Sequence, residues 1–293
     1  MSEKDSVKNT APETAILLVQ CPDQKGIVAK ISDFVYRYNG NILQSDQYST
    51  DPQNGRFFMR LEFCFDPQQV PPAHLEKEFE ILAGGLNADW AIKYASARLK
   101  MGIMVSRFDH CLVDLLYLWR SGELKVDIPV VISNHPDVEE IVTSYGVAFN
   151  YVPVEKDRKR QNEQQQLDML GETDFLVLAR YMQILSGYFI AGYGKDIINI
   201  HHSFLPSFKG ANPYRQAYDR GVKVIGATAH YVTEDLDEGP IIEQVVENVS
   251  HRDTVQDLKR KGKHLEKIAL ANAIRAHIEH RVIRFRNKTI VFA

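Results

Sequence analysis

The sequence predicts an α/β protein, with an N-terminal ferredoxin-like βαββαβ domain followed by a mostly parallel, Rossmann-like sheet domain. Two patterns carry this prediction. Residues 14–97 follow the order strand, helix, strand, strand, helix, strand, and from residue 98 short apolar strands alternate with amphipathic helices. The composition agrees, because 44% hydrophobic and 25% charged residues in a chain of 293 are typical of globular proteins. We expect a polar tail over residues 1–13 and domains over 14–97 and 98–293.

In the first domain, apolar residues recur first at strand and then at helical spacing. The predicted elements are a strand over 15–21, a helix from Ile27 to Val35, strands over 42–50 and 56–65 around a turn at 51–55, a helix after Pro72 and a strand over 89–94. The turn at Asn39-Gly40-Asn41 ends the first helix, and in a domain of this kind it is also a segment to examine for ligand binding.

In the second domain, nearly all-apolar strands indicate a buried parallel sheet with helices on both faces. The predicted elements are strands over 99–105, 129–133, 148–152, 174–179 and 197–200, helices over 112–119 and 136–144, a strand pair at 222–232 and 241–249, a long helix from about Asp253 and a hairpin over 282–292. The charged run over 156–166 is predicted to be a solvated loop that leads into a helix carrying Leu167 and Leu170.

Charge and composition exclude several functions. The net charge of −3 argues against binding to nucleic acid, which needs a basic surface. No apolar stretch approaches the roughly 18 residues of a membrane span, and no signal peptide is evident. The three separated cysteines have no metal-binding spacing, which suggests free thiols in a reducing compartment. We expect a cytoplasmic protein without nucleic-acid or membrane partners.

The most informative segment runs from Asn199 to Pro206, after the apolar strand at 197–200. Strand side chains repeat every two residues, so Asn199 and His201 point to the same side, at the strand end where α/β sheets bind ligands. An amide and an imidazole there suit oxyanion stabilisation and proton transfer. By themselves they fit a structural strand end equally well. Downstream, Asp237 precedes Gly239-Pro240 and could pair with the imidazole, although spacing alone supports this weakly.

Taken together, these motifs resemble the formyltransferase family that uses 10-formyltetrahydrofolate. The matching residues are Asn199 to His201, Ser203, Leu205-Pro206, Lys209-Gly210 and the run from Asp237 to Ile242, with Ala179 to Ser186 similar to the folate-contacting segment. The N-terminal domain resembles an ACT domain, including its entry at Asp23 to Ile27. An ACT domain followed by a formyltransferase domain is the arrangement of the formyltetrahydrofolate deformylases, which release formate, a supply for purine biosynthesis that balances one-carbon pools.

The segment after the first strand of the second domain bears on where the formyl group goes. Glycinamide ribonucleotide transformylases of this family carry a Gly-rich turn there, whose backbone holds the acceptor's phosphate. This chain has no glycine at that point. Phe108 adds bulk, Asp109 would repel a phosphate and also suits a helix N-cap, and His110 lines the blocked acceptor pocket. We therefore expect water to accept the formyl group.

The resemblance implies a mechanism. Asp237, with His201, would orient and deprotonate water, and Asn199 with protonated His201 would stabilise the oxyanion. Met182, Ile184 and Leu185 would line the pteridine slot, with plain core packing as the alternative. His230 would hold the catalytic side chains in position without contacting the substrate, or it would be an ordinary core histidine. No metal site and no cofactor are expected, because no acid or cysteine lies at ligand spacing beside His201 and His202.

Three functional classes stay open: hydrolysis, formyl transfer to an amine or an aminoacyl-tRNA, and non-enzymatic sensing. Hydrolysis is favoured because the phosphate cradle is missing while Asn199, His201 and Asp237 are all present. Domains that resemble the ACT type bind small amino acids and associate through exposed sheet edges. We therefore expect a homo-oligomer, with either an amino-acid effector or a purely structural interface at this domain.

Overall fold

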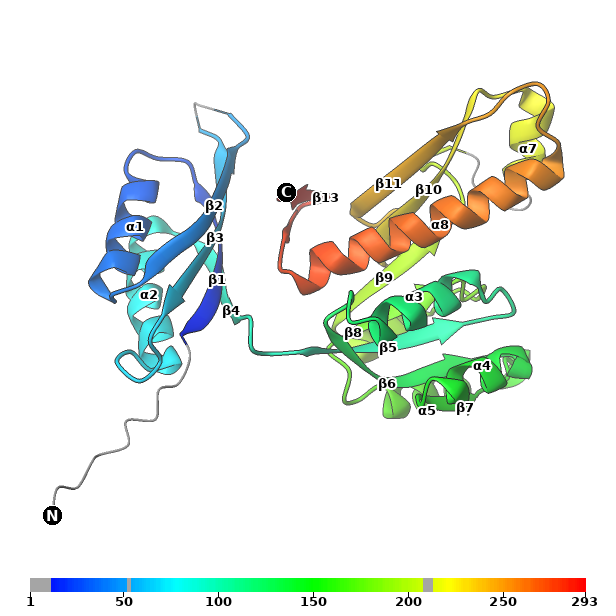
Figure 1. The fold of residues 1–293 in the computed structure, drawn as a ribbon, viewed down its shortest axis with the longest axis horizontal. Helices are drawn as coiled ribbons and strands as arrows, with labels where there is room; N and C mark the ends of the chain where they lie inside the picture. The colour runs from blue at the N-terminus through cyan, green and yellow to red at the C-terminus, as the bar shows by residue number, and fades with distance from the viewer. Residues whose placement is uncertain (1–11, 52–53, 208–212) are drawn as a thin grey trace, which may run out of the picture. The chain divides into compact units, whose positions relative to one another are not determined.

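The computed structural model describes residues 12–51, 54–207 and 213–293, which form two compact units divided between Ala97 and Arg98 (Figure 1). Residues 1–11 of the polar tail expected over residues 1–13 lie outside the described residues. The same is true of two residues of the 51–55 turn and of Lys209-Gly210. The predicted fold class is confirmed in both units. Among the described residues, no helix combines the length and the apolar character that crossing a membrane requires.

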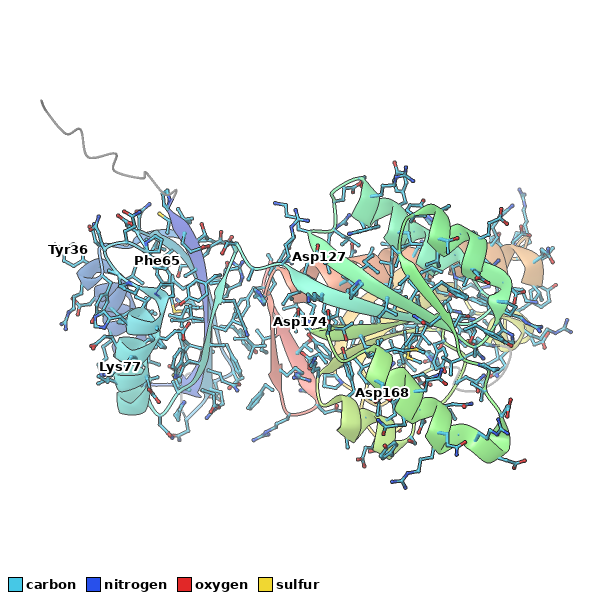
Figure 2. The ribbon with its side chains drawn as sticks, turned by 90° about the horizontal axis from the view of Figure 1, so that it is seen from below. Tyr36, Phe65, Lys77, Asp127, Asp168 and Asp174 are labelled. Carbon is cyan, nitrogen blue, oxygen red and sulfur yellow. The ribbon has the colours of Figure 1, made fainter. Side chains whose placement is uncertain are left out.

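The first unit is a four-stranded antiparallel sheet of order β2-β3-β1-β4. Its elements are β1 (Glu13–Pro22), α1 (Ile27–Arg37), β2 (Asn41–Ser49), β3 (Arg56–Phe65), α2 (Pro72–Leu86) and β4 (Asp89–Tyr94). The two helices cover one face of the sheet (Figure 1), and Tyr36 on the outer side of α1 points to solvent (Figure 2).

Apolar residues at helical spacing build the core of this unit. Ile27, Ile31 and Val35 of α1 are buried, as are Leu75 and Phe79 of α2. Helix α1 ends where Asn39 adopts a left-handed backbone (φ 55°), and the next strand begins at Asn41. The sheet edge at β2 is exposed along its length except for half-buried Asp46.

The second unit is a seven-stranded sheet of order β11-β10-β9-β8-β5-β6-β7, in which β10 alone runs antiparallel to the other six strands. Its strands are β5 (Leu99–Val105), β6 (Val126–Ser133), β7 (Ala148–Tyr151), β8 (Phe175–Ala179), β9 (Asp196–His201), β10 (Val224–Tyr231) and β11 (Ile241–Asn248). A separate hairpin of β12 (Val282–Phe285) and β13 (Lys288–Val291) follows.

Helices cover both faces of this sheet. One face packs against α3 (His110–Arg120), α4 (Glu139–Ser144) and α8 (Val255–Ile278). The other packs against α5 (Lys159–Met169) and α6 (Gly187–Tyr193), and a short helix α7 (Pro213–Arg220) follows β9. A capping box starts α8, since Thr254 and Asp257 each bond the other's backbone N–H.

The solvated loop predicted over 156–166 is wrong, because α5 occupies most of that run. The helix shows little apolar periodicity, and its buried side chains are the polar Glu163 and Gln166. Both bond residues of the segment that follows β8. Glu163 accepts from the Ser186 N–H at 3.0 Å, and Gln166 donates to the Tyr181 hydroxyl at 3.0 Å. The helix thus packs through hydrogen bonds that a hydrophobic pattern does not reveal.

The topology places the functional edge of the sheet. The chain runs from β5 outward to β6 and β7, then returns to β8 on the other side of β5. This reversal creates a crevice beyond the carboxyl ends of β5 and β8, where open α/β sheets bind ligands. In Figure 2, Asp127 and Asp174 mark the opposite, amino ends of β6 and β8. The segments after Val105 and Ala179 therefore lie at the candidate site.

Candidate active site

A cavity of about 270 Å³ lies at this edge of the sheet. Three segments contribute most of its lining: the end of β9, the loop after β8 and the loop between β10 and β11. The lining includes Arg180, the run from Tyr181 to Leu185, Asn199, His201, His202, His230 and Asp237. The structure therefore brings together the three residues predicted to be catalytic and the three predicted to bind substrate.

Strand pairing holds two of these side chains side by side. Asn199 of β9 lies opposite His230 of β10, and Asn199 Nδ2 is 3.2 Å from His230 Nε2. His230 Nδ1 lies 2.9 Å from the Tyr231 carbonyl, which can only accept, so Nδ1 carries the proton and Nε2 accepts from Asn199. His230 thereby accepts from one N–H of the Asn199 amide, and the second N–H has no partner among the described residues.

Asp237 reaches the site from the loop between β10 and β11. Its backbone is left-handed (φ 58°), a conformation that is strained for a residue other than glycine and often occurs at functional sites. Two residues later the chain passes so close to β10 that a Cβ on Gly239 would lie 1.8 Å from the Tyr231 carbonyl oxygen. Glycine is required there, and this close approach turns the loop back toward the cavity.

The His201 ring connects Asp237 to the cavity. Nδ1 of His201 lies 3.2 Å from Oδ2 of Asp237, while Nε2 is buried and has no hydrogen-bond partner among the described residues. Burial raises the pKa of Asp237, but the hydrogen bond from His201 Nδ1–H lowers it, and the balance holds this pKa well below its usual range. Asp237 is therefore a carboxylate that accepts from Nδ1–H, which leaves the Nε2 lone pair available.

The segment predicted to bind folate is an open loop fixed at several points. The Met182 N–H donates to Ser106 Oγ at 3.0 Å, and Lys159 Nζ donates to the Ile184 carbonyl at 2.9 Å. Met182 is 50% and Ile184 62% exposed, so these side chains are not core residues. Leu185 is half-buried. A second cavity of about 400 Å³ adjoins the same loop on the α5 side.

The residues predicted to block the acceptor pocket lie between β5 and α3, and none of them lines the 270 Å³ cavity directly. Asp109 is exposed at the N-cap position of α3 without a side-chain cap bond. The guanidinium carbon of Arg180 lies over the Phe108 ring, 5.3 Å from the ring centroid. His110 Nε2 is 2.7 Å from Glu266 Oε2. Two of the three thus contact a neighbouring cluster.

The sequence did not predict this cluster, which Glu266 forms with His110, Tyr214 and Arg180. Glu266 of α8, which is 1% exposed, lies 2.7 Å from the Tyr214 hydroxyl and 3.4 Å from Arg180 Nε. His202 lies between the cluster and the site, with ring centroids 5.1 Å from His201 and 6.1 Å from Tyr214. The one available sign was Glu266 itself, an acid among the apolar residues of α8, because a buried charge normally has a partner of opposite charge.

His110, Cys111 and Glu266 bring three possible metal ligands within 4.8 Å of one another. Their chemistry does not favour a cation. Both Glu266 oxygens already have partners, and the positive Arg180 lies 3.4 Å away. Burial, and then the charge of Glu266, raise the pKa of the Cys111 thiol, which keeps it from becoming a thiolate ligand. The donor set fits an ion pair with a protein cation better than a metal centre.

Comparisons with known proteins agree with this arrangement. The formyl transferase family model matches residues 99–274, and the ACT domain model matches residues 15–84. A formyltetrahydrofolate deformylase of Synechocystis sp. is 49% identical over 96% of this chain and 99% of its own length. One from Bacillus subtilis is 47% identical over 98% and 97%. The crystal structure of a formyltetrahydrofolate deformylase from Pseudomonas syringae superimposes with a TM-score of 0.91 at 44% identity, over 98% of this chain and 96% of that one.

Proposed function

Since this chain belongs to the formyltetrahydrofolate deformylases and hydrolyses 10-formyltetrahydrofolate to formate and tetrahydrofolate, we propose that His201 moves the proton during hydrolysis. One observation carries the proposal. The Nδ1 atom of His201 is engaged with Asp237, whereas Nε2 is buried and unpartnered among the described residues, on a ring that lines the cavity. A base that is oriented by a carboxylate and open on its other nitrogen is the arrangement required for activating water.

In the first step, Nε2 of His201 takes a proton from water while the water oxygen attacks the formyl carbon. Asp237 holds the ring in the required tautomer and stabilises the imidazolium that forms. The low pKa of Asp237 makes its carboxylate a poor base, so the proton belongs on His201. This assignment refines the sequence-based hypothesis, in which Asp237 and His201 together deprotonate water.

In the second step, the tetrahedral intermediate collapses. The free N–H of the Asn199 amide, directed by His230, stabilises the negative oxygen. The bond between the formyl carbon and N10 breaks, and the proton on His201 passes to N10. Formic acid and tetrahydrofolate result: one proton of the water ends on N10, the water oxygen stays in the acid, and the second proton passes to solvent as the acid ionises to formate. The reaction needs no metal or other cofactor, because protein groups provide both the base and the oxyanion donor.

We propose that the pteridine binds along the loop of Met182, Ile184 and Leu185. The exposure of the first two side chains supports this, because an unliganded apolar slot leaves its lining open to solvent. Hydrolysis by this chain would supply formate to purine biosynthesis and balance one-carbon pools.

For the first unit, we propose self-association through the exposed β2 edge and binding of a small amino acid as effector. Unpaired backbone groups on an edge strand favour pairing with a second copy. The free cysteines, of which Cys21 and Cys111 are buried, suit a cytoplasmic setting.

The decisive assay is incubation with 10-formyltetrahydrofolate alone in water enriched in oxygen-18. Hydrolysis by the proposed route gives formate with one heavy oxygen and an equal amount of tetrahydrofolate. The His201→Asn variant should bind tetrahydrofolate normally and release formate slowly. If formate appeared only after an amine was added, hydrolysis would be the wrong reaction. A fully active His201→Asn variant would remove His201 from the chemistry.

A further inference from the structure

Arg180 stands directly after β8 at the crevice between β5 and β8. Its backbone is left-handed (φ 64°), a region that favours glycine, yet the position holds one of the largest side chains. Such strain persists only where the surroundings hold it, and it concentrates at functional sites. The side chain is 8% exposed and lines the cavity that contains Asn199 and His201.

The Arg180 guanidinium lies against one acid and one aromatic ring. Nε lies 3.4 Å from Oε2 of Glu266, and the guanidinium carbon lies 5.3 Å from the ring centroid of Phe108. Phe108 follows β5 and Arg180 follows β8, so the two segments meet across the crevice. The backbone reinforces this junction, because the Ser106 N–H donates to the Arg180 carbonyl at 3.3 Å.

Glu266 is itself held rigidly. Tyr214 donates to Oε1 and His110 bonds Oε2, each at 2.7 Å. Tyr214 can reach Glu266 because position 262 of α8 is glycine, where a Cβ would lie 1.9 Å from the Tyr214 hydroxyl. The charge of this fixed carboxylate attracts the guanidinium, although the buried Nε of Arg180 makes no hydrogen bond among the described residues.

We propose that Arg180 is a specificity-determining residue of the hydrolysis: its bulk occupies the space beside His201 that a primary amine needs, so that only water reaches the formyl carbon. The inference rests on the proposed function. If an amine entered, its nitrogen would attack the formyl carbon and the bond to N10 would break. The amine proton would reach N10 through His201, and an N-formyl amine and tetrahydrofolate would form. Selection against a competitor by occupied space is an ordinary specificity device.

The test uses glycinamide as the amine and measures the ratio of N-formylglycinamide to formate by mass spectrometry. Arg180→Gly suits the left-handed backbone and empties the space, and it should raise the ratio at least tenfold. Arg180→Met restores bulk without charge and should stay within threefold of the wild-type ratio. Arg286→Gly is the matched control, because Arg286 is also left-handed (φ 56°) but lies in the turn of the β12-β13 hairpin. Its ratio should equal that of the wild type.

Removing Arg180 leaves the buried Glu266 without its cation, which can destabilise the fold. The double variant Arg180→Gly/Glu266→Gln removes both charges and keeps partners for His110 and Tyr214, so it should show the same rise. An unchanged ratio in a folded, formate-releasing Arg180→Gly or double variant overturns the proposal. So does a rise in Arg180→Met equal to that in Arg180→Gly, or loss of both products in folded, folate-binding variants. Failure of the wild type to release formate without an amine would instead contradict the proposed function.

Discussion

His201 Nδ1 and Asp237 Oδ2 lie 3.2 Å apart in a hydrogen-bonded contact that leaves the opposite nitrogen of the imidazole unpartnered among the described residues. The two residues come from different segments, one at the end of β9 and the other in the loop after β10. Their meeting depends on the antiparallel pairing of β9 with β10, which brings that loop back over the strand end. A histidine oriented on one side and free on the other can both take and return a proton.

Replacing Asp237 by asparagine should leave folding and folate binding intact but slow the reaction. The amide can no longer stabilise the imidazolium or enforce the required tautomer. We expect kcat to fall about 10²- to 10⁴-fold with little change in KM. Formate release gives kcat, and calorimetric titration with tetrahydrofolate gives binding. Glu238→Gln removes the neighbouring exposed acid and should behave as the wild type. A near-normal kcat in Asp237→Asn would exclude the carboxylate from the mechanism.

Asn199 and His230 should act as one unit. Asn199→Ala removes the oxyanion donor and should lower kcat about 10²- to 10³-fold. His230→Phe removes the acceptor that aims this amide, 3.2 Å away, and should lower kcat by less while KM changes little. The double variant should be no slower than Asn199→Ala, because His230 acts through Asn199. Losses in kcat that multiply would show that His230 has a separate role.

Sequence patterns predicted most of the fold because apolar spacing reflects burial. The strands of both sheets and the long α8 follow from such spacing. Only the end of helix α5, which carries Leu167, could be found in this way, because the buried residues Glu163 and Gln166 of its earlier turns are polar. Their burial depends on partners supplied by Tyr181 and Ser186, and hydropathy does not register a hydrogen bond formed with a distant segment.

In the candidate site, too, local sequence patterns indicate some residues, whereas only the packing of distant segments reveals others. Spacing alone placed Asn199 and His201 at one strand end and drew attention to Asp237 before a glycine, but choosing the three as a site depended on the resemblance to the formyltransferase family. The pairing of Arg180 with Glu266 could not be predicted, since it depends on how α8 crosses the sheet and places one turn beside the end of β8. The residues flanking each partner carry no sign of the other. Such a pair becomes visible only through packing.

The stability of the protein should fall as the pH drops from about 6.5 to about 4, partly through His202. Burial, and then the charges of Arg180 and His201, lower the pKa of His202 to about 4. In the unfolded chain the imidazole takes a proton near pH 6.5, so below this pH the unfolded state binds more protons and unfolding is favoured. The fall in the pKa from 6.5 to about 4 corresponds to roughly 3–3.5 kcal/mol at about 1.4 kcal/mol per pH unit.

Urea unfolding at pH 7 and pH 4.5 measures this contribution. His202→Phe should lose less stability between the two pH values than the wild type does. His264→Asn changes an exposed histidine and should match the wild-type loss. An NMR titration in which the His202 ring became protonated near pH 6.5 would contradict the argument, because the folded and unfolded states would then bind the proton equally.

Gly262 of α8 should tolerate no side chain, although alanine is normally the better residue within a helix. A Cβ there would lie 1.9 Å from the Tyr214 hydroxyl and would push this group off Glu266. We expect Gly262→Ala to lower the free energy of unfolding by about 1–3 kcal/mol, the usual cost of overpacking. Gly84 of α2 is the matched control, because no atom of the described residues lies within 4 Å of the position that an added Cβ would take, and Gly84→Ala should stabilise by about 0.5–1 kcal/mol. Urea unfolding followed by circular dichroism compares the two variants. Equal gains in stability would mean that Tyr214 moves aside freely and that its bond to Glu266 contributes little to the fold.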